Sequence, residues 1–553
     1  MKPSSLARLL APAALVVVPV GCPVYADLYE PNQLAGTGAG GGNGGAGGAT
    51  VTSGTGGAGG GCVPASSAPC YDGPAGTEGH GLCQAGSKTC NAEGAAYGAC
   101  IGEVTPTQED CATATDEDCD GLAPACKGNL VWSERFGDAT TQRAQSVAVD
   151  GSGSVLLGGW FYGAINFGGG SLVSAGLNDG FLAKLDAGGN HLWSRRFGDA
   201  ESQQVTAIAV DSTGYVVIAG TFSGVIDLGG GPLTSKGGLD VFLAKLDLDG
   251  NHVWSRSFGD AKDQSAVSLA VDSNGNVLLS GDFFGTLDFG DGQLTSVGGL
   301  DVFLAKLDAA GNHLWSKSFG DIDDQKGLRV AANGAGDILV GGDFFGTMDF
   351  GGGPLPTMGG NDVVIAKMNS AGNHLWSKRF SGASDQIQLR FAMDEAGDAV
   401  LAGGFMGSVD LGGGALTSAG GLDLFLAKLS ADGNHVWSER FGDENDQSPA
   451  SLALDSSGNV VLTGDLQGAV NFGGGPLGSV GGFDVFLAKL DAGGHHLWSQ
   501  RFGDAADQHP ICVAVDSSNN IFLTGDLEGS VDFGNGSLVS TGASDVFVAK
   551  FRP

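Results

Sequence analysis

The feature of this chain that most limits its possible folds is a tryptophan that recurs at a fixed interval. Seven of the eight tryptophans lie 61 residues apart, without insertions between copies, and only Trp160 falls off this pattern. Self-similarity at a fixed period is the signature of repeat architectures, and seven copies of this length favour a β-propeller with seven blades. The regularly spaced residues are Trp132, Trp193, Trp254, Trp315, Trp376, Trp437 and Trp498.

Each repeat consists of short apolar stretches separated by Gly, Asn and Asp. The stretches lack the 3.6-residue periodicity of helices. The chain contains 100 glycines although 42% of its residues are hydrophobic, a composition that suits short strands and tight turns. We therefore predict four strands per blade, named A to D in chain order. In one repeat they cover residues 268–271, 277–283, 302–307 and 314–319.

The two ends of the repeat region predict how the ring closes. The first strand, Leu130–Phe136, has the sequence of a D strand, whereas the last, Val546–Phe551, has that of a C strand. Pairing them completes the last blade and leaves no open sheet edge. The predicted fold is all-β: a seven-bladed β-propeller of four-stranded blades over residues 127–553, closed by the N-terminal outer strand 130–136.

The repeats resemble a known family. The segments ALDSSGNVVLTGD (Ala453–Asp465) and DVFLAKLD (Asp301–Asp308) are similar to the β-propeller repeats common in exported bacterial proteins, over about residues 130–553. This resemblance implies the fold and no particular activity. AKLDAGGNHLW (Ala183–Trp193) also resembles the tryptophan-docking motif of quinoprotein propellers, which implies that each Trp packs between neighbouring blades. The Asp is one place late, so the quinone cofactor is not carried over.

The N-terminus has the pattern of an export signal. Lys2 and Arg8 accompany a twelve-residue apolar stretch, Leu9–Val20, which is too short to span a bilayer. We expect residues 1–21 to be a signal peptide.

The residues that follow indicate how the signal is processed. Gly21-Cys22 resembles a bacterial lipobox, which implies acylation of Cys22, although Pro19 stands where the family has Leu. Ordinary secretory cleavage after Ala26 is the alternative. We expect an exported lipoprotein at the outer membrane or cell surface, with a periplasmic or secreted protein as the alternative.

Two further segments precede the repeats. Residues 22–61 form the anchor region and a Gly-rich linker with a reach on the order of 30 Å. Eight of the ten cysteines lie within residues 62–126, which in an exported chain implies a small module with several disulfides, whose connectivity the sequence leaves open. With Cys22 acylated, Cys512 is left as a lone thiol, and we expect it to be a small, buried core residue.

An acidic motif in the cysteine-rich module suggests a metal site. Asp116, Asp118 and Asp120 alternate and are followed by Gly121, as in the first half of a calcium-binding loop. The Glu expected later in such a loop is replaced by Lys127. The segment EDCATATDEDCDG resembles a metal-binding Cys/Asp motif of secreted bacterial proteins, which implies Ca²⁺ as a cofactor. A plain acidic turn held by disulfides is the alternative.

The formal net charge of −34 argues against nucleic acid, because phosphate binding needs clustered Lys and Arg. It suits solubility or cation binding. Acidic residues concentrate in the D-to-A loops and near the ends of four B strands, which antiparallel pairing places on one face at the channel mouth. Several converging carboxylates there could bind Ca²⁺. The B-strand residues are Asp282, Asp343, Asp465 and Asp526.

Positions that differ between repeats are candidates for a specific function. Fourteen residues after the Trp, five repeats carry a small residue, whereas two adjacent repeats carry Arg329 and Arg390. We interpret this pair as a candidate anion-binding patch. The alternative is that both arginines neutralise Asp324 and Asp385 on the same face.

Polar residues that recur in all repeats are expected to serve the blade. The Gln ten residues after each Trp should bond to its own loop. The Asp that opens each C strand should cap a turn, and the Lys five residues later should reach solvent with its charged end.

We find no nucleophile, base and acid that together interrupt the repeats, as a catalytic site should. The sequence therefore favours a non-catalytic binding or scaffolding lipoprotein. The loop face of a monomeric propeller would bind a glycan or a protein, while the lipid anchor would hold it at a membrane. The alternatives are a propeller hydrolase or lyase acting on an extracellular polymer, and a purely structural envelope spacer.

Overall fold

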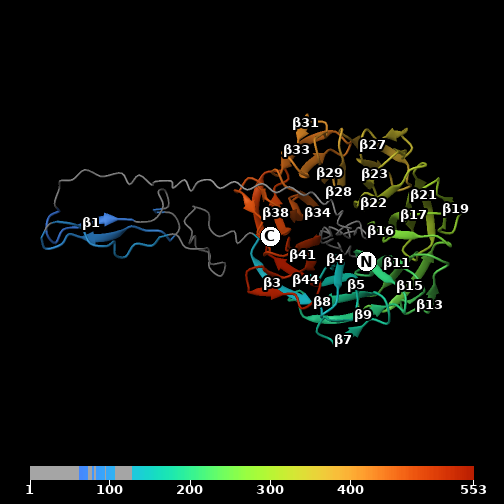
Figure 1. The fold of residues 1–553 in the computed structure, drawn as a ribbon, viewed down its shortest axis with the longest axis horizontal. Helices are drawn as coiled ribbons and strands as arrows, with labels where there is room; N and C mark the ends of the chain where they lie inside the picture. The colour runs from blue at the N-terminus through green and yellow to red at the C-terminus, as the bar shows by residue number, and fades with distance from the viewer. Residues whose placement is uncertain (1–61, 72–77, 80–81, 94, 106–127) are drawn as a thin grey trace, which may run out of the picture. The chain divides into compact units, whose positions relative to one another are not determined.

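The computed structural model describes residues 62–71, 78–79, 82–93, 95–105 and 128–553. The chain divides into two compact units, a small N-terminal module and a propeller that begins at Gly128, and we describe them separately. The propeller consists of seven four-stranded antiparallel sheets arranged as a ring (Figure 1). The predicted fold class is therefore confirmed. The described part of the chain contains no helix long and apolar enough to cross a membrane.

The blades share one strand order, A-B-C-D, from the ring axis outward, and we number them 1 to 7 in the chain order of their A strands (Figure 1). The A strands are β4 (Gln142–Val149), β10 (Gln203–Val210), β16 (Gln264–Val271), β22 (Gln325–Ala332), β28 (Gln386–Met393), β34 (Gln447–Leu454) and β40 (Gln508–Val515). The B strands are β5 (Val155–Phe161), β11 (Val216–Phe222), β17 (Val277–Phe283), β23 (Ile338–Phe344), β29 (Ala399–Phe405), β35 (Val460–Leu466) and β41 (Ile521–Leu527). The C strands are β8 (Asp179–Leu185), β14 (Asp240–Leu246), β20 (Asp301–Leu307), β26 (Asp362–Met368), β32 (Asp423–Leu429), β38 (Asp484–Leu490) and β44 (Asp545–Phe551). The D strands are β9 (His191–Phe197), β15 (His252–Phe258), β21 (His313–Phe319), β27 (His374–Phe380), β33 (His435–Phe441), β39 (His496–Phe502) and β3 (Leu130–Phe136).

Each B-to-C connection contains a second, smaller element that the sequence analysis did not predict. It is a two-stranded hairpin, whose strands are only two or three residues long. The pairs are β6 (Ala164–Asn166) with β7 (Ser171–Val173), β12 (Val225–Asp227) with β13 (Pro232–Thr234), β18 (Thr286–Asp288) with β19 (Gln293–Thr295), β24 (Thr347–Met348) with β25 (Leu355–Pro356), β30 (Ser408–Asp410) with β31 (Ala415–Thr417), β36 (Ala469–Val470) with β37 (Leu477–Gly478), and β42 (Ser530–Asp532) with β43 (Ser537–Val539).

The local sequence explains why these segments are strands and turns. Strands β17 and β20 are mostly apolar and buried at almost every position, because neighbouring blades cover both of their faces. In the turn before β17, Asp272 Oδ1 accepts hydrogen bonds from the N–H groups of Asn274 and Asn276, at 2.9 and 3.0 Å. Gly275 in the same turn has a φ of 75°, a conformation that glycine adopts readily.

The ring closes as the sequence predicts. Strand β3 pairs with β44, and their register joins Phe136 to Val546 and Ser133 to Ala549. Blade 7 therefore combines β40, β41 and β44 with a D strand from the opposite end of the propeller sequence. Each A strand also lies against the A strand of the next blade, and β40 lies against β4. The ring consequently has no open sheet edge at its seam.

The hydrophobic core of the propeller lies between blades rather than within them. Seven clusters of buried residues occur in the described chain, and each is formed by facing sides of two neighbouring blades. Between blades 2 and 3, for example, Leu243 and Trp254 of blade 2 pack with Leu279 and Phe303 of blade 3. A blade in isolation would therefore expose the apolar side chains on both faces of its sheet.

The repeated tryptophans dock between blades, as the resemblance implied. Trp254, on the D strand of blade 2, is 9% exposed and lies over Gly311 in the C-to-D turn of blade 3, where a Cβ would be 3.0 Å from the indole. Its Nε1 donates to the Ala309 carbonyl in the same turn, at 3.1 Å. Five other tryptophans make the equivalent bond. At the seam, Trp498 lies against Gly128, and its Nε1 has no hydrogen-bond partner among the described residues.

The Lys of the C strand is buried in six of the seven blades, so the expectation that it reaches solvent is wrong for these. Lys184 is 5% exposed, and its Nζ lies 2.8 Å from a carboxylate oxygen of Asp150, in the A-to-B turn of the same blade. Nζ also donates to the Leu248 carbonyl of blade 2, the oxygen that accepts the Trp193 Nε1 hydrogen bond. The Lys is buried because both a carboxylate and the next blade supply acceptors for its ammonium group.

The Asp that opens each C strand caps a turn, as predicted, but it is also buried and paired. Asp484 Oδ2 accepts a hydrogen bond from the Val480 N–H at 2.8 Å. In five blades an Arg of the D strand forms an ion pair with this Asp. The pairs are Arg135 with Asp545, Arg196 with Asp179, Arg379 with Asp362, Arg440 with Asp423, and Arg501 with Asp484.

Blades 2 and 3 lack this arginine and carry Ser257 and Ser318 in its place. In blade 3, Asp301 is 2% exposed, and no ion pair with it occurs in the described structure. Its Oδ1 has no hydrogen-bond partner there, as in the equivalent Asp of every other blade. Burial raises the pKa of Asp301 to about 6, although the hydrogen bond from the Val297 N–H acts to lower this pKa. The negative charge of Asp301 is therefore poorly compensated compared with that of the aspartates that pair with an Arg.

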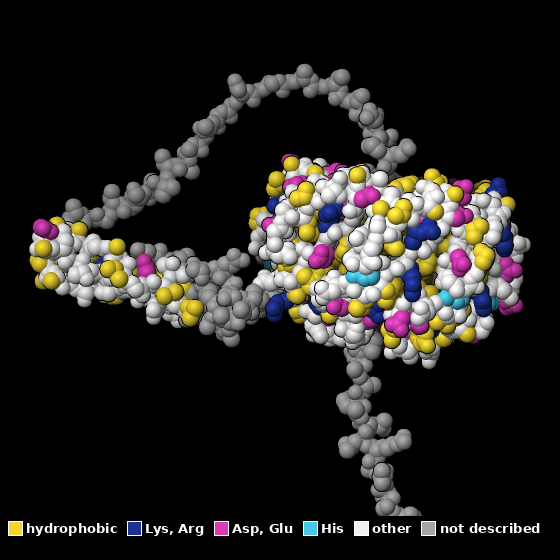
Figure 2. Space-filling model, turned by 90° about the horizontal axis from the view of Figure 1, so that it is seen from below, with side chains coloured by type: hydrophobic (Ala, Val, Ile, Leu, Met, Phe, Trp, Pro, Cys, Tyr) yellow, Lys and Arg dark blue, Asp and Glu magenta, His cyan; other side chains and the backbone are white. Residues whose placement is uncertain are grey.

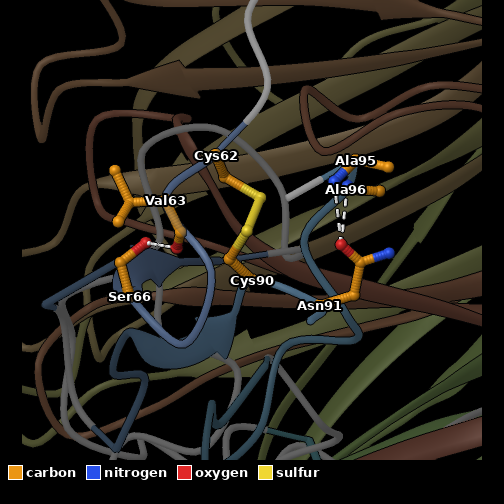
Figure 3. Close-up of a disulfide and its surroundings, with 7 residues drawn as sticks. All are labelled: Cys62, Val63, Ser66, Cys90, Asn91, Ala95 and Ala96. Atoms are coloured by element: carbon orange, nitrogen blue, oxygen red, sulfur yellow. Dashed lines mark hydrogen bonds between the residues drawn. A yellow bond between two sulfur atoms is a disulfide. The ribbon is translucent and has the colours of Figure 1, made fainter. Parts of the chain in front are cut away.

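The small N-terminal module contains one hairpin, β1 (Ser67–Cys70) and β2 (Gly86–Thr89), and two described disulfides. Cys62 pairs with Cys90, and Cys70 pairs with Cys100, which settles part of the connectivity that the sequence left open. Figure 3 shows the first disulfide between two tight turns. In these turns Ser66 Oγ donates to the Val63 carbonyl, and Asn91 Oδ1 accepts from the N–H groups of Ala95 and Ala96.

Several predicted positions lie outside the described residues, namely Cys22 and the proposed calcium ligands Asp116, Asp118 and Asp120. Cys512 lies within them, in strand β40. It is fully buried, as expected, but it is disulfide-bonded, so the expectation of a lone thiol is wrong.

The docking hydrogen bond predicts a difference between two conservative substitutions. Trp254→Phe removes the bond from Nε1 to Ala309, whereas Trp498→Phe removes no such bond. We expect Trp254→Phe to lower the free energy of unfolding by about 1 kcal/mol more than Trp498→Phe. Urea unfolding followed by circular dichroism measures both changes. Equal losses in the two variants would show that the hydrogen bond adds nothing to docking.

The uncompensated carboxylate of blade 3 predicts a pH-dependent substitution. Because the folded pKa of Asp301 lies above its unfolded value, its contribution to stability is present at low pH and is lost as pH rises through about 6. We expect Asp301→Asn to be more stable than wild type at about pH 7.5, by on the order of 1 to 3 kcal/mol, and to lose this advantage near about pH 4. Urea unfolding at both pH values measures it.

The matched control for this experiment is Asp484→Asn in blade 6. It removes the partner of Arg501, which lies 2.6 Å from Asp484, and we expect it to destabilise the protein at about pH 7.5. The interpretation of Asp301 is wrong if both Asn variants are destabilised alike at that pH.

Candidate binding site at the channel mouth

Strand register places the D-to-A loops, the starts of the A strands and the ends of the B strands on one face of the ring. In blade 1, Arg143 near the start of β4 pairs with Trp160 near the end of β5. In blade 7, His509 of β40 pairs with Asp526 of β41. The predicted common face is therefore confirmed, and the side chains nearest the axis on this face surround the channel mouth.

The acidic D-to-A loops use their carboxylates to hold the loops themselves. Asp260 Oδ1 accepts from the Lys262 N–H at 2.8 Å and from Gln264 Nε2 at 2.9 Å, while Oδ2 accepts from the Thr286 N–H at 2.8 Å. Gln264 Nε2 also donates to the Phe284 carbonyl. The prediction that the repeated Gln bonds to its own loop is confirmed.

The loop that reads SGASDQ shows what this network requires. Gly382 stands where the other blades have the Asp that accepts from Gln. Gln386 donates instead to the Ser384 carbonyl, and its Oε1 has no hydrogen-bond partner in the part of the chain that the structure describes. This variation changes a loop bond and adds no charged group.

The four aspartates near the ends of B strands each reach the A strand of the next blade. Asp282 accepts from the Gly327 N–H at 2.8 Å, and Asp343 accepts from the Gln388 and Leu389 N–H groups at 2.7 and 2.9 Å. Gly327 and Gln388 have φ values of 71° and 59°, a turn that aims backbone N–H groups at a carboxylate.

Side chains replace these backbone donors in the last two blades. Pro510 lacks an N–H, and Asp465 lies 2.9 Å from His509 Nδ1 instead. Across the seam, Asp526 lies 2.6 Å from Arg143 Nε. The four aspartates named from the sequence thus each connect two neighbouring blades. The described residues contain no group of three or more His, Cys, Asp or Glu arranged to hold a metal.

Arg329 and Arg390 occupy a position that bridges blades. In three other repeats this position is a Ser whose Oγ accepts from the backbone of the next blade, as Ser146 does from the Ile208 N–H at 3.1 Å. Arg390 Nε donates to the Ala450 carbonyl of blade 6. Arg329 is 5% exposed, and its charge lowers the pKa of Asp282, which burial raises to about 7.

The aspartates that the alternative interpretation assigned to the two arginines have other contacts. Asp324 lies 3.7 Å from Lys326 Nζ, and Asp385 Oδ1 accepts from the Asn361 N–H at 2.8 Å. The anion-binding patch at Arg329 and Arg390 stays a prediction.

The sevenfold pattern is also broken along three consecutive blades, at the junction of blades 6 and 7 and at that of blades 7 and 1. Trp160 occupies the position that is Asp282 in blade 3 and Asp526 in blade 7. Its ring meets Tyr162 edge to face, with centroids 5.6 Å apart, and Tyr162 is 39% exposed. We define the mouth cluster as these two aromatic residues with the two charged pairs beside them. Its members are Trp160, Tyr162, Arg143, Asp526, His509 and Asp465.

His509 of the mouth cluster is charged at neutral pH. Burial lowers the pKa of His509, but the hydrogen bond and charge of Asp465 outweigh it, with help from Asp526, and raise this pKa to about 9. His509 is therefore a cation at neutral pH and cannot accept a proton as a general base. It also lies beside the Phe483 ring, at 5.7 Å between centroids. The cluster combines aromatic faces with two cations and two carboxylates.

Sequence reasoning identified part of this cluster. Trp160 was visible as the one tryptophan off the 61-residue pattern, and Asp465 and Asp526 were named as acidic residues of this face. Arg143 and His509 were missed. The position eleven residues after the repeated Trp could have revealed them, because it holds six different residue types in seven blades. Its residues are Arg143, Gln204, Ser265, Lys326, Ile387, Ser448 and His509.

Comparisons with known proteins agree with a repeat-built propeller. No family model matches the chain. An uncharacterized WD repeat-containing protein of Acanthamoeba polyphaga mimivirus is 21% identical over 531 residues, which cover 76% of this chain and 38% of that protein. Regulatory protein FlaEY of Caulobacter vibrioides is 25% identical over 419 residues, covering 68% of this chain and 42% of that protein. The chain spans about two fifths of the length of these relatives.

Solved structures with a similar fold have low sequence identity to this chain. They include the polysaccharide lyase Uly1, 11% identical, covering 78% of this chain and 93% of that chain with a TM-score of 0.39. The WD40 domain of Neurospora crassa Pan2 is 8% identical and covers 76% and 97%, with a TM-score of 0.35. Likeness at this level indicates nothing about a substrate or partner. The chain is a seven-repeat β-propeller with similarity to WD-repeat proteins.

The His509 pair predicts a pH-dependent contribution to stability. Because the folded pKa of His509 is raised above its ordinary value, this contribution is present below about pH 6.5 and is lost as pH rises through about 9. We expect His509→Gln to lower the free energy of unfolding by about 1 kcal/mol near neutral pH, allowing for partial exposure, and by less above about pH 9.

Urea unfolding across this pH range tests the prediction. His495→Gln is the control, because His495 pairs with Asp491 while its side chain is 82% exposed, and we expect little effect from its loss. A His509→Gln cost that does not depend on pH would contradict the assignment of a charged His509.

Proposed function

We propose that this protein is an exported, non-catalytic binding module whose mouth cluster takes a carboxylated glycan. The observation that carries the proposal is the break in sevenfold symmetry at this cluster. At four of the six positions equivalent to Trp160, an Asp instead contacts the next blade. At the junction of blades 7 and 1, Trp160 and the exposed Tyr162 add aromatic surface beside Arg143 and His509.

The chemistry of the cluster suits an acidic sugar. The apolar C–H face of a pyranose ring can stack on an aromatic side chain, and Tyr and Trp combine a large apolar face with a polar group. Arg143 and His509 supply cationic donors for a sugar carboxylate. Asp465 and Asp526 supply acceptors for sugar hydroxyl groups. The charged state of His509 favours binding over proton-transfer chemistry.

The N-terminal segments complete the proposal. Acylation of Cys22 would hold the protein at a membrane, and the cysteine-rich module would act as a spacer, stiffened by Ca²⁺ at Asp116, Asp118 and Asp120. The high negative charge, −34 overall, would keep the monomeric propeller soluble outside the membrane.

Binding of tetragalacturonate, measured by calorimetric titration, tests the proposed site. We expect Trp160→Ala to raise the dissociation constant about tenfold, because one aromatic contact contributes about 1 kcal/mol or slightly more. Uncharged cellotetraose should bind more weakly than the acidic sugar. Tyr215→Ala is the control, since Tyr215 is 38% exposed in an A-to-B turn, on the opposite face.

Two results would redirect the proposal. Equal binding by Trp160→Ala and wild type would place the site elsewhere, and loss of binding only in the double variant Arg329→Ala, Arg390→Ala would assign it to the predicted anion patch. Cleavage of the sugar during titration would favour the hydrolase or lyase alternative.

A further inference from the structure

One position on the loop face differs systematically between the two halves of the ring. It is the first residue of each B-to-C connection, thirty residues after the repeated Trp. Three successive blades carry a large apolar side chain here, and Phe284, Phe345 and Met406 are 37%, 46% and 37% exposed. The residues at this position, from blade 1 to blade 7, are Tyr162, Ser223, Phe284, Phe345, Met406, Gln467 and Glu528.

Hydrogen bonds to the neighbouring loop hold the backbone at this position. The Phe284 N–H donates to the Asp263 carbonyl at 3.0 Å, and the Met406 N–H donates to the Asp385 carbonyl at 3.1 Å. The Phe345 carbonyl accepts from Gln325 Nε2 at 2.9 Å. The backbone at each of these three positions is therefore held by at least one hydrogen bond, and that of Phe284 by two.

Further exposed apolar residues lie in the loops that adjoin these positions. Within blade 3, Gly285 donates to Ser296 Oγ at 3.0 Å, which holds Phe284 near the adjoining Val297. Gly298 packs against the backbone of Ile322, where a Cβ would lie 2.8 Å from the Ile322 Cα. Ile322 is 77% exposed, and at this loop position five blades have Ala and one has Glu.

Blades 4 and 5 continue the surface in the same manner. Gly346 donates to Thr357 Oγ1, which holds Phe345 near Met358, and Met358 is 58% exposed. The next D-to-A loop lies against both Gly359 and Gly407, which follow Met358 and Met406. We define the apolar arc by these residues of blades 3 to 5. They are Phe284, Val297, Ile322, Phe345, Met358 and Met406.

The apolar arc differs from the exposed apolar residues of the D strands. The D strands expose a Leu or Val before the Trp, as at Leu192 and Leu375, each 50% exposed. These are spaced one per blade, and the side view in Figure 2 shows apolar side chains interspersed with polar and charged ones. A contiguous exposed apolar surface marks an interaction site, whereas single exposed residues are ordinary. Phe and Met are also enriched in protein interfaces.

Charge identifies the kind of partner that fits the arc. Asp263 and Asp324 flank it and are exposed, and Asp324 has 56% of its side chain accessible. The nearby cations are already engaged, since Lys262 lies over the Phe284 ring and Lys326 pairs with Asp324. A net charge of −34 disfavours a second copy of the chain or an anionic lipid surface. We propose that the apolar arc docks a cationic amphipathic segment of a partner protein.

This docking surface is separate from the mouth cluster and does not depend on glycan binding. Its test uses two fluorescein-labelled peptides of one amphipathic helical pattern, one composed of Leu and Lys and the other of Leu and Glu. Fluorescence anisotropy measures their binding to the full chain. We expect the Leu/Lys peptide to bind and the Leu/Glu peptide to bind at least about tenfold more weakly.

The test variant carries Ile322→Ala and Phe345→Gln. Both replacements are residues that other blades carry at the equivalent positions, namely Ala261 and Gln467, so the blades retain compatible sequences. The control variant carries Leu192→Ser and Leu375→Ser on the D strands. Neither pair of changes alters the net charge, so a nonspecific attraction of Lys to the acidic protein affects both variants alike.

We expect the test variant to bind the Leu/Lys peptide about tenfold more weakly than wild type, and the control variant to bind it as wild type does. The proposal is overturned by equal binding in the test variant and wild type, by equal binding of the two peptides, or by no binding up to about 1 mM. Sedimentation velocity supplies a further outcome: self-association that only the test variant abolishes would assign the arc to a second copy and overturn it as well.

Discussion

Docking of each blade on the next is the interaction on which the whole propeller depends. The buried clusters lie between blades, so a single sheet has no core of its own. At each regular junction, an indole covers a glycine of the next blade. At four of these junctions its Nε1 and a lysine donate to the same carbonyl, as Trp193 and Lys184 do to Leu248. Repeat proteins of this kind gain stability from contacts between neighbours, and closure gives every blade two of them.

Docking also determines which polar residues are available to a ligand. Many acidic side chains that seemed suited to cation binding accept hydrogen bonds from backbone N–H groups, as Asp260 does within its loop. Others connect blades, as Asp343 does. The high acidic content of the chain therefore has a structural explanation in many repeats. The positions that depart from the repeat, in the mouth cluster and the apolar arc, are more informative about function.

The fold could be predicted because the repeat leaves few alternatives. The 61-residue interval defined the blades, and the order of strands at the two ends of the propeller defined the seam between β3 and β44. The limits of A strands were less accurate, since β16 begins at Gln264 and not at residue 268. A polar Gln is not typical of a buried strand, and only its bonds to Asp260 and the Phe284 carbonyl make this start favourable.

The candidate site was predicted less completely, for a related physical reason. Lys184 has the sequence of an exposed residue, and its burial depends on a carboxylate 34 positions earlier and a carbonyl in the next blade. Arg143 and His509 acquire their importance from aspartates of the preceding blade. Contacts between blades join residues that are distant in sequence, so comparing repeats shows which positions vary without showing what they meet.

The composite seventh blade has a consequence for the order of folding. Strand β3 is synthesised first among the propeller strands, but its partner is β44, and the bonded residues Arg135 and Asp545 are 410 positions apart. Until β44 has been made and has reached it, β3 has no sheet to join, and the first and last blades each expose an apolar face. Contacts at such separation form slowly, and exposed strand edges favour aggregation. A nascent chain of this protein therefore carries an unpaired strand and an uncovered blade face for almost the whole of the synthesis of its propeller.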